Sequence, residues 1–330
     1  MASATGSEIC PHRDIVVIGA SAGGLRALRE LVAGLPPDLP AAVFVVMHFS
    51  PEHASKLGEM LSRWGPLPAR TALHGDRIRH GRIYVAPNDN HLTLHRDFVR
   101  VTRGPKENGH RPAVDPLFRT AARMYGNRVV GVVLTGNLSC GTEGLQAIKA
   151  AGGVAVVQSD PEYSGMPQSA RLHVEVDRLV PMDRMSDVLT ELVTEPIPET
   201  AESEVTGPRT LAAQPSPIVC PACNGSMTET VEGGLLRFRC HVGHAFGVDS
   251  LLAEQSESLE AALWASVRAL EETAQLADRL ALSAERKLSP RFREKANALR
   301  QHAALIQDIL LHGTTVEPED AAVAEAPVEQ

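Results

Sequence analysis

Short apolar runs rich in valine and isoleucine recur along residues 14–194, and most are followed by a turn and a segment with helical spacing. The clearest runs are Ile15–Ile18, Ala42–Met47, Val129–Leu134 and Val154–Val157. Such runs, alternating with helices, predict buried parallel strands with helices on both faces of the sheet. We therefore expect an α/β domain with a doubly wound, mainly parallel sheet. In folds of this class a site lies beyond the carboxyl ends of the strands.

Two further β-rich runs, Arg82–Val85 and His91–Leu94, flank the turn-rich segment Pro87–Asn90. Two runs joined by such a turn predict a β-hairpin.

Changes in composition divide the rest of the 330-residue chain. Proline, glutamate, threonine, serine and alanine dominate residues 195–217, which predicts a linker. The remaining predicted parts are an N-terminal tail (1–13), the α/β domain (14–194), a Cys/His module (218–247), a helical hairpin (248–312) and an acidic disordered tail (313–330).

Composition excludes several classes of protein. No run reaches the ~18–20 apolar residues that a membrane helix needs, so we expect no membrane insertion. The first eight residues lack the basic start and apolar core of a signal peptide. The formal net charge of −8 argues against nucleic acid as a partner. Three of the five cysteines fall in one metal-like cluster rather than a disulfide framework, so we expect a cytoplasmic protein.

Ser21 lies directly after the first predicted strand, in the loop Gly19–Gly24 that leads into a helix. A serine placed there can act as a nucleophile, because free N–H groups at the helix start can bind an oxyanion. The same loop can cradle a phosphate or be a structural tight turn. However, its glycine spacing, G-x-x-x-G-G, differs from the G-x-G-x-x-G of dinucleotide-binding proteins.

His48 ends the neighbouring predicted strand, at the same sheet edge as Ser21. A serine hydroxyl needs such a base within hydrogen-bond reach, which favours a hydrolase site. A third group normally orients the histidine. The loop where we expect that group, Thr135–Gly141, contains no carboxylate.

Residues 14–193 resemble the catalytic domain of the CheB protein-glutamate methylesterases. The matching motifs are Gly19–Gly24, Met47-His48, Ala86-Pro87 with His91-Leu92, Arg111–Phe118, Leu134–Gly136 and Gly165–Pro167. The resemblance implies hydrolysis of γ-glutamyl methyl esters and deamidation of glutamines on the helices of methyl-accepting receptors. It also implies that Ser21 is the nucleophile and His48 the general base, with backbone near Ala22 and Asn137 stabilising the oxyanion.

The chain departs from the family pattern in two places. About a dozen residues precede the first predicted strand, so we expect no N-terminal receiver domain and no control by phosphorylation within this chain. The family motif T-G-x-x-x-D-G supplies an aspartate where this chain has Cys140. Cys140 is either a thiolate that supports His48 or a small packing residue. Glu143, one turn further on, is either a substitute acid or a partner of the helix dipole. The loop of Asp115 is expected to face substrate.

Cys220 and Cys223 form a C-x₂-C pair, and Cys240 follows after sixteen residues with His244 three positions beyond it. Four sulfur and nitrogen ligands in two pairs are typical of structural zinc. Cys220, Cys223, Cys240 and His244 are therefore the predicted ligands of a zinc-ribbon-like module, and His241 competes with His244 for the fourth place. Because the segment has few apolar residues, the metal would supply much of its folding free energy.

Leucines recur at near-heptad spacing along residues 249–283, and a second apolar stripe follows Pro290. This pattern predicts an antiparallel helical hairpin. The stripes are either internal packing or, through residues 249–312, a surface for a homodimer or a helical partner.

Three functions follow from these patterns. The first is a serine esterase and amidase of the CheB type, whose activity would be impaired by Cys140 in place of the family's aspartate. The second is a catalytically degraded adaptor that binds receptors or signalling proteins. A nucleotide-binding enzyme is disfavoured by the glycine spacing and by His48.

Overall fold

The computed structural model describes residues 12–48, 56–197, 212–283 and 288–312. Most of the predicted N-terminal tail and linker, and all of the acidic tail, lie outside these residues. The strands are β1 (Ile15–Ala20), β2 (Ala42–Met47), β3 (Ala69–Thr71), β4 (Arg82–Val85), β5 (His91–His95), β6 (Phe98–Thr102), β7 (Val129–Val133), β8 (Val154–Gln158), β9 (Arg178–Val180), β10 (Gln214–Val219), β11 (Ser226–Glu232), β12 (Leu235–Cys240) and β13 (Ala245–Gly247). The α-helices are α1 (Gly24–Gly34), α2 (Leu57–Trp64), α3 (Val114–Tyr125), α4 (Thr142–Ala150), α5 (Gly165–His173), α6 (Met185–Thr194), α7 (Val248–Ser283) and α8 (Ser289–His312).

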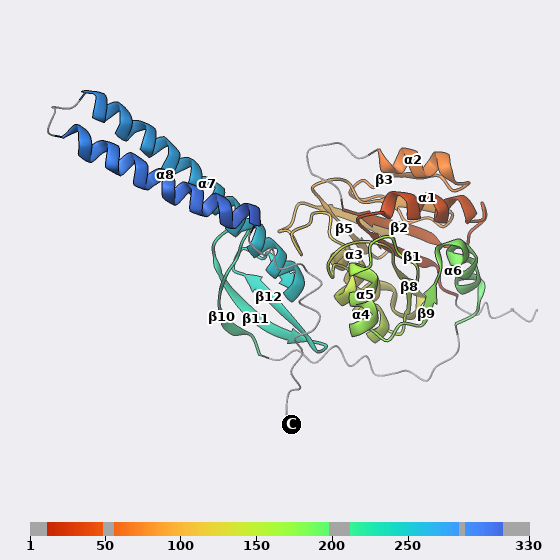
Figure 1. Ribbon diagram of the computed structural model, residues 1–330. Coiled ribbons are helices and arrows are strands. Elements are labelled where there is room, and N and C mark those ends of the chain that lie inside the picture. The colour runs from red at the N-terminus through yellow and green to blue at the C-terminus, as the bar shows by residue number, and fades with distance from the viewer. Residues whose placement is uncertain (1–11, 49–55, 198–211, 284–287, 313–330) are drawn as a thin grey trace, which may run out of the picture. The chain divides into compact units, whose positions relative to one another are not determined.

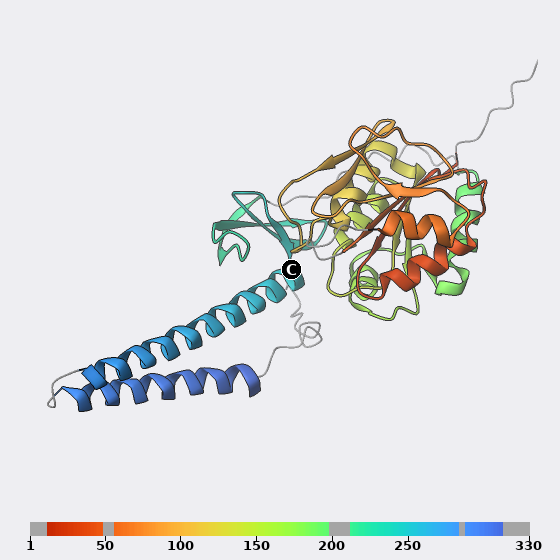
Figure 2. The ribbon, with the colours of Figure 1, turned by 90° about the horizontal axis from the view of Figure 1, so that it is seen from above.

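Seven parallel strands form the central sheet in the order β3-β4-β2-β1-β7-β8-β9. Side chains of β1 and β2 are buried on both faces, because helices cover the sheet on both sides. One core joins the sheet to α1, α2 and α6, and the other joins it to α3, α4 and α5 (Figures 1 and 2). The predicted doubly wound α/β fold is confirmed. On one side of the central strand β1 lie β2, β4 and β3, and on the other side lie β7, β8 and β9.

The predicted hairpin of Arg82–Val85 with His91–Leu94 is wrong. β4 lies in the central sheet between β3 and β2, so both of its edges are already paired in parallel. β5 instead pairs with β6 in an antiparallel ribbon. The turn of that ribbon contains Asp97 at φ 63°, a conformation that aspartate tolerates better than most residues.

The Cys/His module is a four-stranded antiparallel sheet in the order β10-β11-β12-β13. β10 begins at Gln214, four residues inside the segment expected to be linker. The prolines at 215 and 217 are tolerated because β10 is an edge strand that pairs with β11 alone. Contacts between Cα atoms group residues 1–250 into one unit, so the module belongs to the same unit as the central sheet.

The described residues 251–283 and 288–312 form a second unit, in which α7 from Leu251 onward pairs with α8 as the predicted helical hairpin. Small side chains line the contact, since Ala274, Ala277 and Ala296 are all buried. Arg300 donates a hydrogen bond to Asp278 across the pair. None of the helices in the described residues is long and apolar enough to cross a membrane.

Candidate active site and metal centre

Ser21 follows β1 directly, at the carboxyl edge of the central sheet. Its backbone N–H donates to the carbonyl of Thr135, the second residue after β7, at 3.0 Å. Gly23 adopts φ 72°, which lets the chain turn sharply into α1 at Gly24. The sequence Ser-Ala-Gly-Gly therefore places the hydroxyl at the start of a helix.

His48 follows β2, the neighbour of β1, and its Nδ1 lies 3.1 Å from Ser21 Oγ. Parallel pairing of β1 with β2 brings these two strand ends together, as predicted from the sequence. Burial, and secondarily repulsion from His110 when that ring is protonated, lowers the pKa of His48 well below its usual value of 6.5. At neutral pH this imidazole is uncharged and can accept the serine proton at Nδ1.

The loop after β7 packs tightly against the serine. A side chain at Gly136 would place its Cβ 2.8 Å from Ser21 Cβ and 2.3 Å from Met166 Sδ, so only glycine fits there. Asn137 follows and is exposed. The backbone N–H groups of Ala22 and Asn137 donate no hydrogen bond to any described residue.

An open hollow of about 550 Å³ borders the serine. Its lining comes from the Ser21–Leu25 loop and from Arg26, Arg29, Met47 and Trp64. The Arg29 guanidinium lies over the Trp64 ring at 6.0 Å. The hollow thus combines apolar surface with two arginine side chains, of which Arg26 pairs with Glu30 at 3.2 Å.

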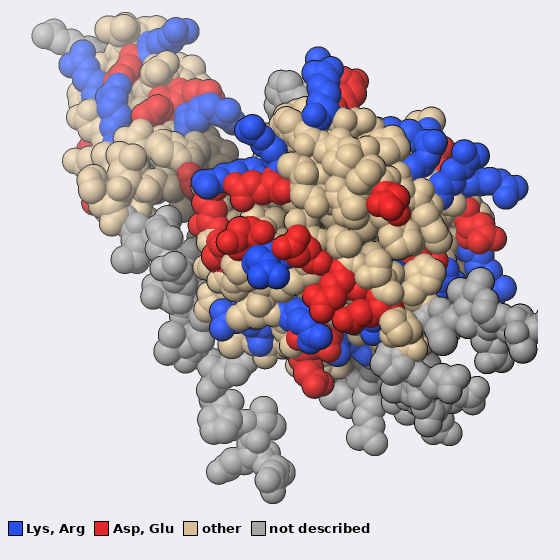
Figure 3. Space-filling model, turned by 90° about the vertical axis from the view of Figure 1, so that its right-hand side faces the viewer, with Lys and Arg blue, Asp and Glu red and all other residues tan. Residues whose placement is uncertain are grey.

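Acidic and basic side chains are interspersed over the face of the molecule in Figure 3.

Cys140 is buried, and its Sγ accepts a hydrogen bond from the backbone N–H of Val114 at 3.4 Å. Burial and the negative charge of Asp115 raise the pKa of this thiol well above its usual value. Both features favour a neutral packing residue at this position over a thiolate. Within the described part of the chain, His48 Nε2 is buried and has no hydrogen-bond partner.

Two nearby carboxylates are also occupied elsewhere. Asp115, expected to face substrate, is instead fully buried in the first turn of α3 and accepts hydrogen bonds from the backbone N–H groups of Gly141 and Gly144 at 3.0 and 2.8 Å. It thereby satisfies donors at the start of α4. Glu143 lies 2.5 Å from Arg237 of the module. Glu143 therefore pairs with an arginine in addition to lying at the start of its own helix.

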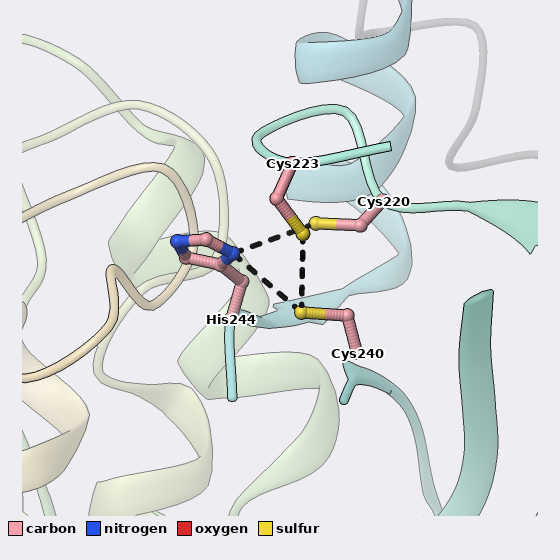
Figure 4. Close-up of side chains that lie close together, drawn as sticks. All are labelled: Cys220, Cys223, Cys240 and His244. Atoms are coloured by element: carbon pink, nitrogen blue, oxygen red, sulfur yellow. Dashed lines mark hydrogen bonds between the residues drawn. The ribbon is translucent and has the colours of Figure 1, made fainter. Parts of the chain in front are cut away.

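The structure brings Cys220, Cys223, Cys240 and His244 together in one cluster (Figure 4). Cys223 Sγ lies 3.6 Å from Cys240 Sγ, and His244 Nδ1 lies 3.5 and 3.7 Å from the sulfurs of Cys240 and Cys220. Ligands at 2.0–2.3 Å from a tetrahedral zinc ion are separated by roughly 3.5–3.8 Å, so these residues fit such an ion. His241 is exposed and is not in the cluster.

Sequence reasoning missed His110, whose ring stacks on His48 with 3.7 Å between centroids and 18° between planes. The signal available was the dipeptide Asn108-Gly109, a strong marker of a tight turn, two residues before it. Arg237 was also missed, because nothing in the sequence of β12, an inner strand of its sheet, indicates a charged partner in a distant helix.

Comparison with known proteins agrees with this geometry. A model of the CheB methylesterase family matches residues 16–189. The chain is 44% identical over 182 residues to protein-glutamate methylesterase/protein-glutamine glutaminase 2 of Anaeromyxobacter dehalogenans (strain 2CP-C), covering 54% of this chain and 53% of that protein. It is 38% identical over 191 residues to the protein of the same name from Methanosarcina mazei, covering 55% and 52%. The chain thus spans about half the length of these curated relatives.

The crystal structure of the Thermotoga maritima CheB methylesterase catalytic domain superimposes with a TM-score of 0.53 at 32% identity. The match covers 56% of this chain and 100% of that domain. The family match spans more than half of the chain and includes both strand ends that carry Ser21 and His48. The chain therefore belongs to the CheB methylesterase family.

Proposed function

We propose that this chain is a serine hydrolase that removes methyl groups from glutamyl side chains of methyl-accepting receptors and deamidates their glutamines. The observation that carries the proposal is the 3.1 Å contact between Ser21 Oγ and His48 Nδ1 beside an open hollow. The names of the relatives supply the substrate class.

The residues suggest the following steps. Ser21 Oγ attacks the ester carbonyl carbon while its proton passes to Nδ1 of His48. The N–H groups of Ala22 and Asn137 stabilise the oxyanion of the tetrahedral intermediate. The intermediate collapses as His48 returns the proton to the departing methoxide, releasing methanol. Water then attacks the acyl-serine by the same route and frees the glutamate carboxylate and Ser21.

No carboxylate among the described residues holds His48 in the way that usually orients a catalytic imidazole. Loss of that role can lower kcat by roughly 10⁴. The alternative function is therefore an adaptor that binds receptors or signalling partners without turnover. What favours the adaptor is the buried Nε2 of His48, which is unpartnered among the described residues.

Methanol release from methylated receptor distinguishes the two, using the natural chain, Ser21→Ala and Cys140→Asp. Turnover by the natural chain that Ser21→Ala abolishes supports the esterase. Turnover by Cys140→Asp alone supports the adaptor. Equal methanol release from Ser21→Ala and the natural chain would sink the serine mechanism.

For the module we propose a structural zinc ion held by Cys220, Cys223, Cys240 and His244. Four protein ligands close the coordination sphere, so the metal would stabilise the fold of the β10–β13 sheet and leave no open position for chemistry.

A further inference from the structure

The residues before His110 form a tight turn. Glu107 and His110 exchange backbone hydrogen bonds of 3.1 and 2.9 Å, and Asn108 and Gly109 between them adopt φ 51° and 75°. Positive φ at both central positions is typical of a turn that Asn-Gly favours. The turn fixes where the chain delivers His110.

The Cys/His module holds this turn by main-chain pairing. The N–H of Asn108 donates to the carbonyl of Ala245 at 2.8 Å, and the N–H of Ala245 donates to the carbonyl of Lys106 at 3.3 Å. Ala245 begins β13 and directly follows His244, a residue of the metal cluster. The turn is therefore paired with the residue directly after a member of the metal cluster.

The Asn108 carboxamide joins the module to the catalytic domain. Its Oδ1 accepts from the N–H of Gly247 in β13 at 2.9 Å, while its Nδ2 donates to Asp115 at 3.1 Å. Asn108 is 3% exposed, so both bonds form away from water. Loss of either leaves a buried polar group unpaired.

Buried ion pairs fix the same contact. Arg237 of β12 is 4% exposed on its side chain and lies 2.5 Å from Glu143 and 3.6 Å from Glu107. Arg119 donates to both carboxylate oxygens of Glu107 at 2.8 and 2.7 Å. The buried Asp115 lies beside this cluster, and burial together with the charge of Asp115 raises the pKa of Glu143 to about 8. Withdrawal of Arg237 would take away the cation nearest to Glu143 in a buried place, which opposes undocking of the module.

On its far side, the turn places His110 flat against the catalytic imidazole. Burial, and secondarily the charge of Lys106, lowers the pKa of His110 to about 4. His110 is therefore uncharged at neutral pH and contacts His48 as a neutral ring. The described residues offer His48 Nε2 no hydrogen bond, so the stack is what this part of the structure provides to hold the ring toward Ser21.

We propose that the Cys/His module is a positioning element for the active site. By clamping the Lys106–His110 turn, the metal-loaded module keeps His110 stacked on His48 and so holds Nδ1 within reach of Ser21. His110 acts through His48 and is a positioning residue. The proposal rests on the function proposed above for Ser21 and His48, and it implies that loss of the metal lowers turnover from a site that contains no metal.

The test uses the full-length zinc-loaded chain, before and after removal of zinc with a chelator and after its return. Three measurements are made: the NMR signals of the His48 ring, the hydrogen exchange of residues 104–112, and kcat and KM for methyl-ester hydrolysis. The variant His48→Gln identifies which NMR signals belong to His48. A displacement of about 1 Å at a catalytic group can cost roughly 10²-fold. We expect chelation to lower kcat by 10–100-fold with KM little changed, to speed exchange in residues 104–112, and to shift the His48 signals.

Two variants separate positioning from unfolding of the module. Asn108→Gly keeps the positive-φ turn and the metal ligands but removes the carboxamide clamp. We expect it to retain zinc and still show the faster exchange and the shifted His48 signals. In His110→Ala, removal of zinc should no longer lower kcat, because the ring through which the module acts on His48 is absent. His241→Ala, an exposed neighbour of Cys240 outside the cluster, is the matched control and should behave as the natural chain.

The NMR and exchange measurements decide the proposal independently of turnover. His48 signals and exchange that stay unchanged when zinc is removed, or when Asn108 is replaced, would overturn it. Shifted signals in a chain without esterase activity would support the positioning while showing that the proposed function fails.

Discussion

Asp115 Oδ1 accepts a hydrogen bond of 2.8 Å from the backbone N–H of Gly144, which ties the first turn of α3 to the first turn of α4. The contact is buried and charged, and Oδ2 of the same carboxylate accepts from Gly141. Asp115→Asn removes the charge and replaces one acceptor by a donor that faces an N–H. We expect it to lower the free energy of unfolding by about 2 kcal/mol. Urea denaturation at neutral pH measures this, with exposed Asp183→Asn as the control. Equal midpoints for the two variants would contradict a structural role for Asp115.

The depressed pKa of His48 predicts the pH dependence of the reaction. Proton abstraction from Ser21 needs the neutral imidazole, and a lowered pKa means that this form persists below pH 6.5. We therefore expect kcat/KM to stay level as the pH falls from about 7.5 to about 6, and to decline only at more acidic values. The measurement is a pH series of ester hydrolysis or of Ser21 labelling by a fluorophosphonate. A decline centred at or above pH 6.5 would show that the imidazole is not buried in solution.

Arg237 and Arg239 lie two residues apart on β12 and give a matched pair of variants. Arg237 is buried against Glu143, while Arg239 is exposed. Arg237→Met leaves Glu143 without its nearest cation, and removal of one partner from a buried pair typically costs 3–5 kcal/mol. Arg239→Met should change stability by less than about 0.5 kcal/mol. Chemical denaturation of both variants provides the comparison, and equal losses would show that the buried pair is not formed.

The metal content of the chain tests the Cys/His cluster. Cys223→Ser should lower bound zinc well below one ion per chain, because three ligands hold the ion less tightly than four. His241→Ala should keep the full content, since His241 lies outside the cluster. Elemental analysis after gel filtration gives the ratio. Zinc loss in His241→Ala with retention in His244→Ala would reverse the assignment of the fourth ligand.

The parts that the sequence predicted correctly are those encoded by local pattern. Each buried strand is a short apolar run, so Ile15–Ile18 and Ala42–Met47 were identifiable, and parallel pairing then placed Ser21 beside His48. The Cys220-x₂-Cys223 spacing likewise predicted its cluster. Both features can be predicted from residues close together in the sequence, or from those residues and the rule that parallel strands end at the same edge of a sheet.

The parts that the sequence did not predict depend on pairs far apart in the chain. The hairpin assigned to β4 failed because β4 finds both its partners elsewhere in the sheet. Arg237 meets Glu143 across almost a hundred residues, and neither residue differs in type from many exposed ones. His110 directly precedes a matched motif, Arg111–Phe118, yet only the folded turn shows that its ring contacts His48.

The bond between Gly247 and Asn108 spans 139 positions of the chain. Domains generally fold from the N-terminus as the ribosome makes them, at about 5–20 residues per second. The central sheet is complete once β9 has emerged, but the turn that carries His110 has no β13 to pair with until residue 247 is made. The nascent protein therefore passes through a stage with a finished sheet and an unclamped His110, and that stage lasts until residue 247 has been made.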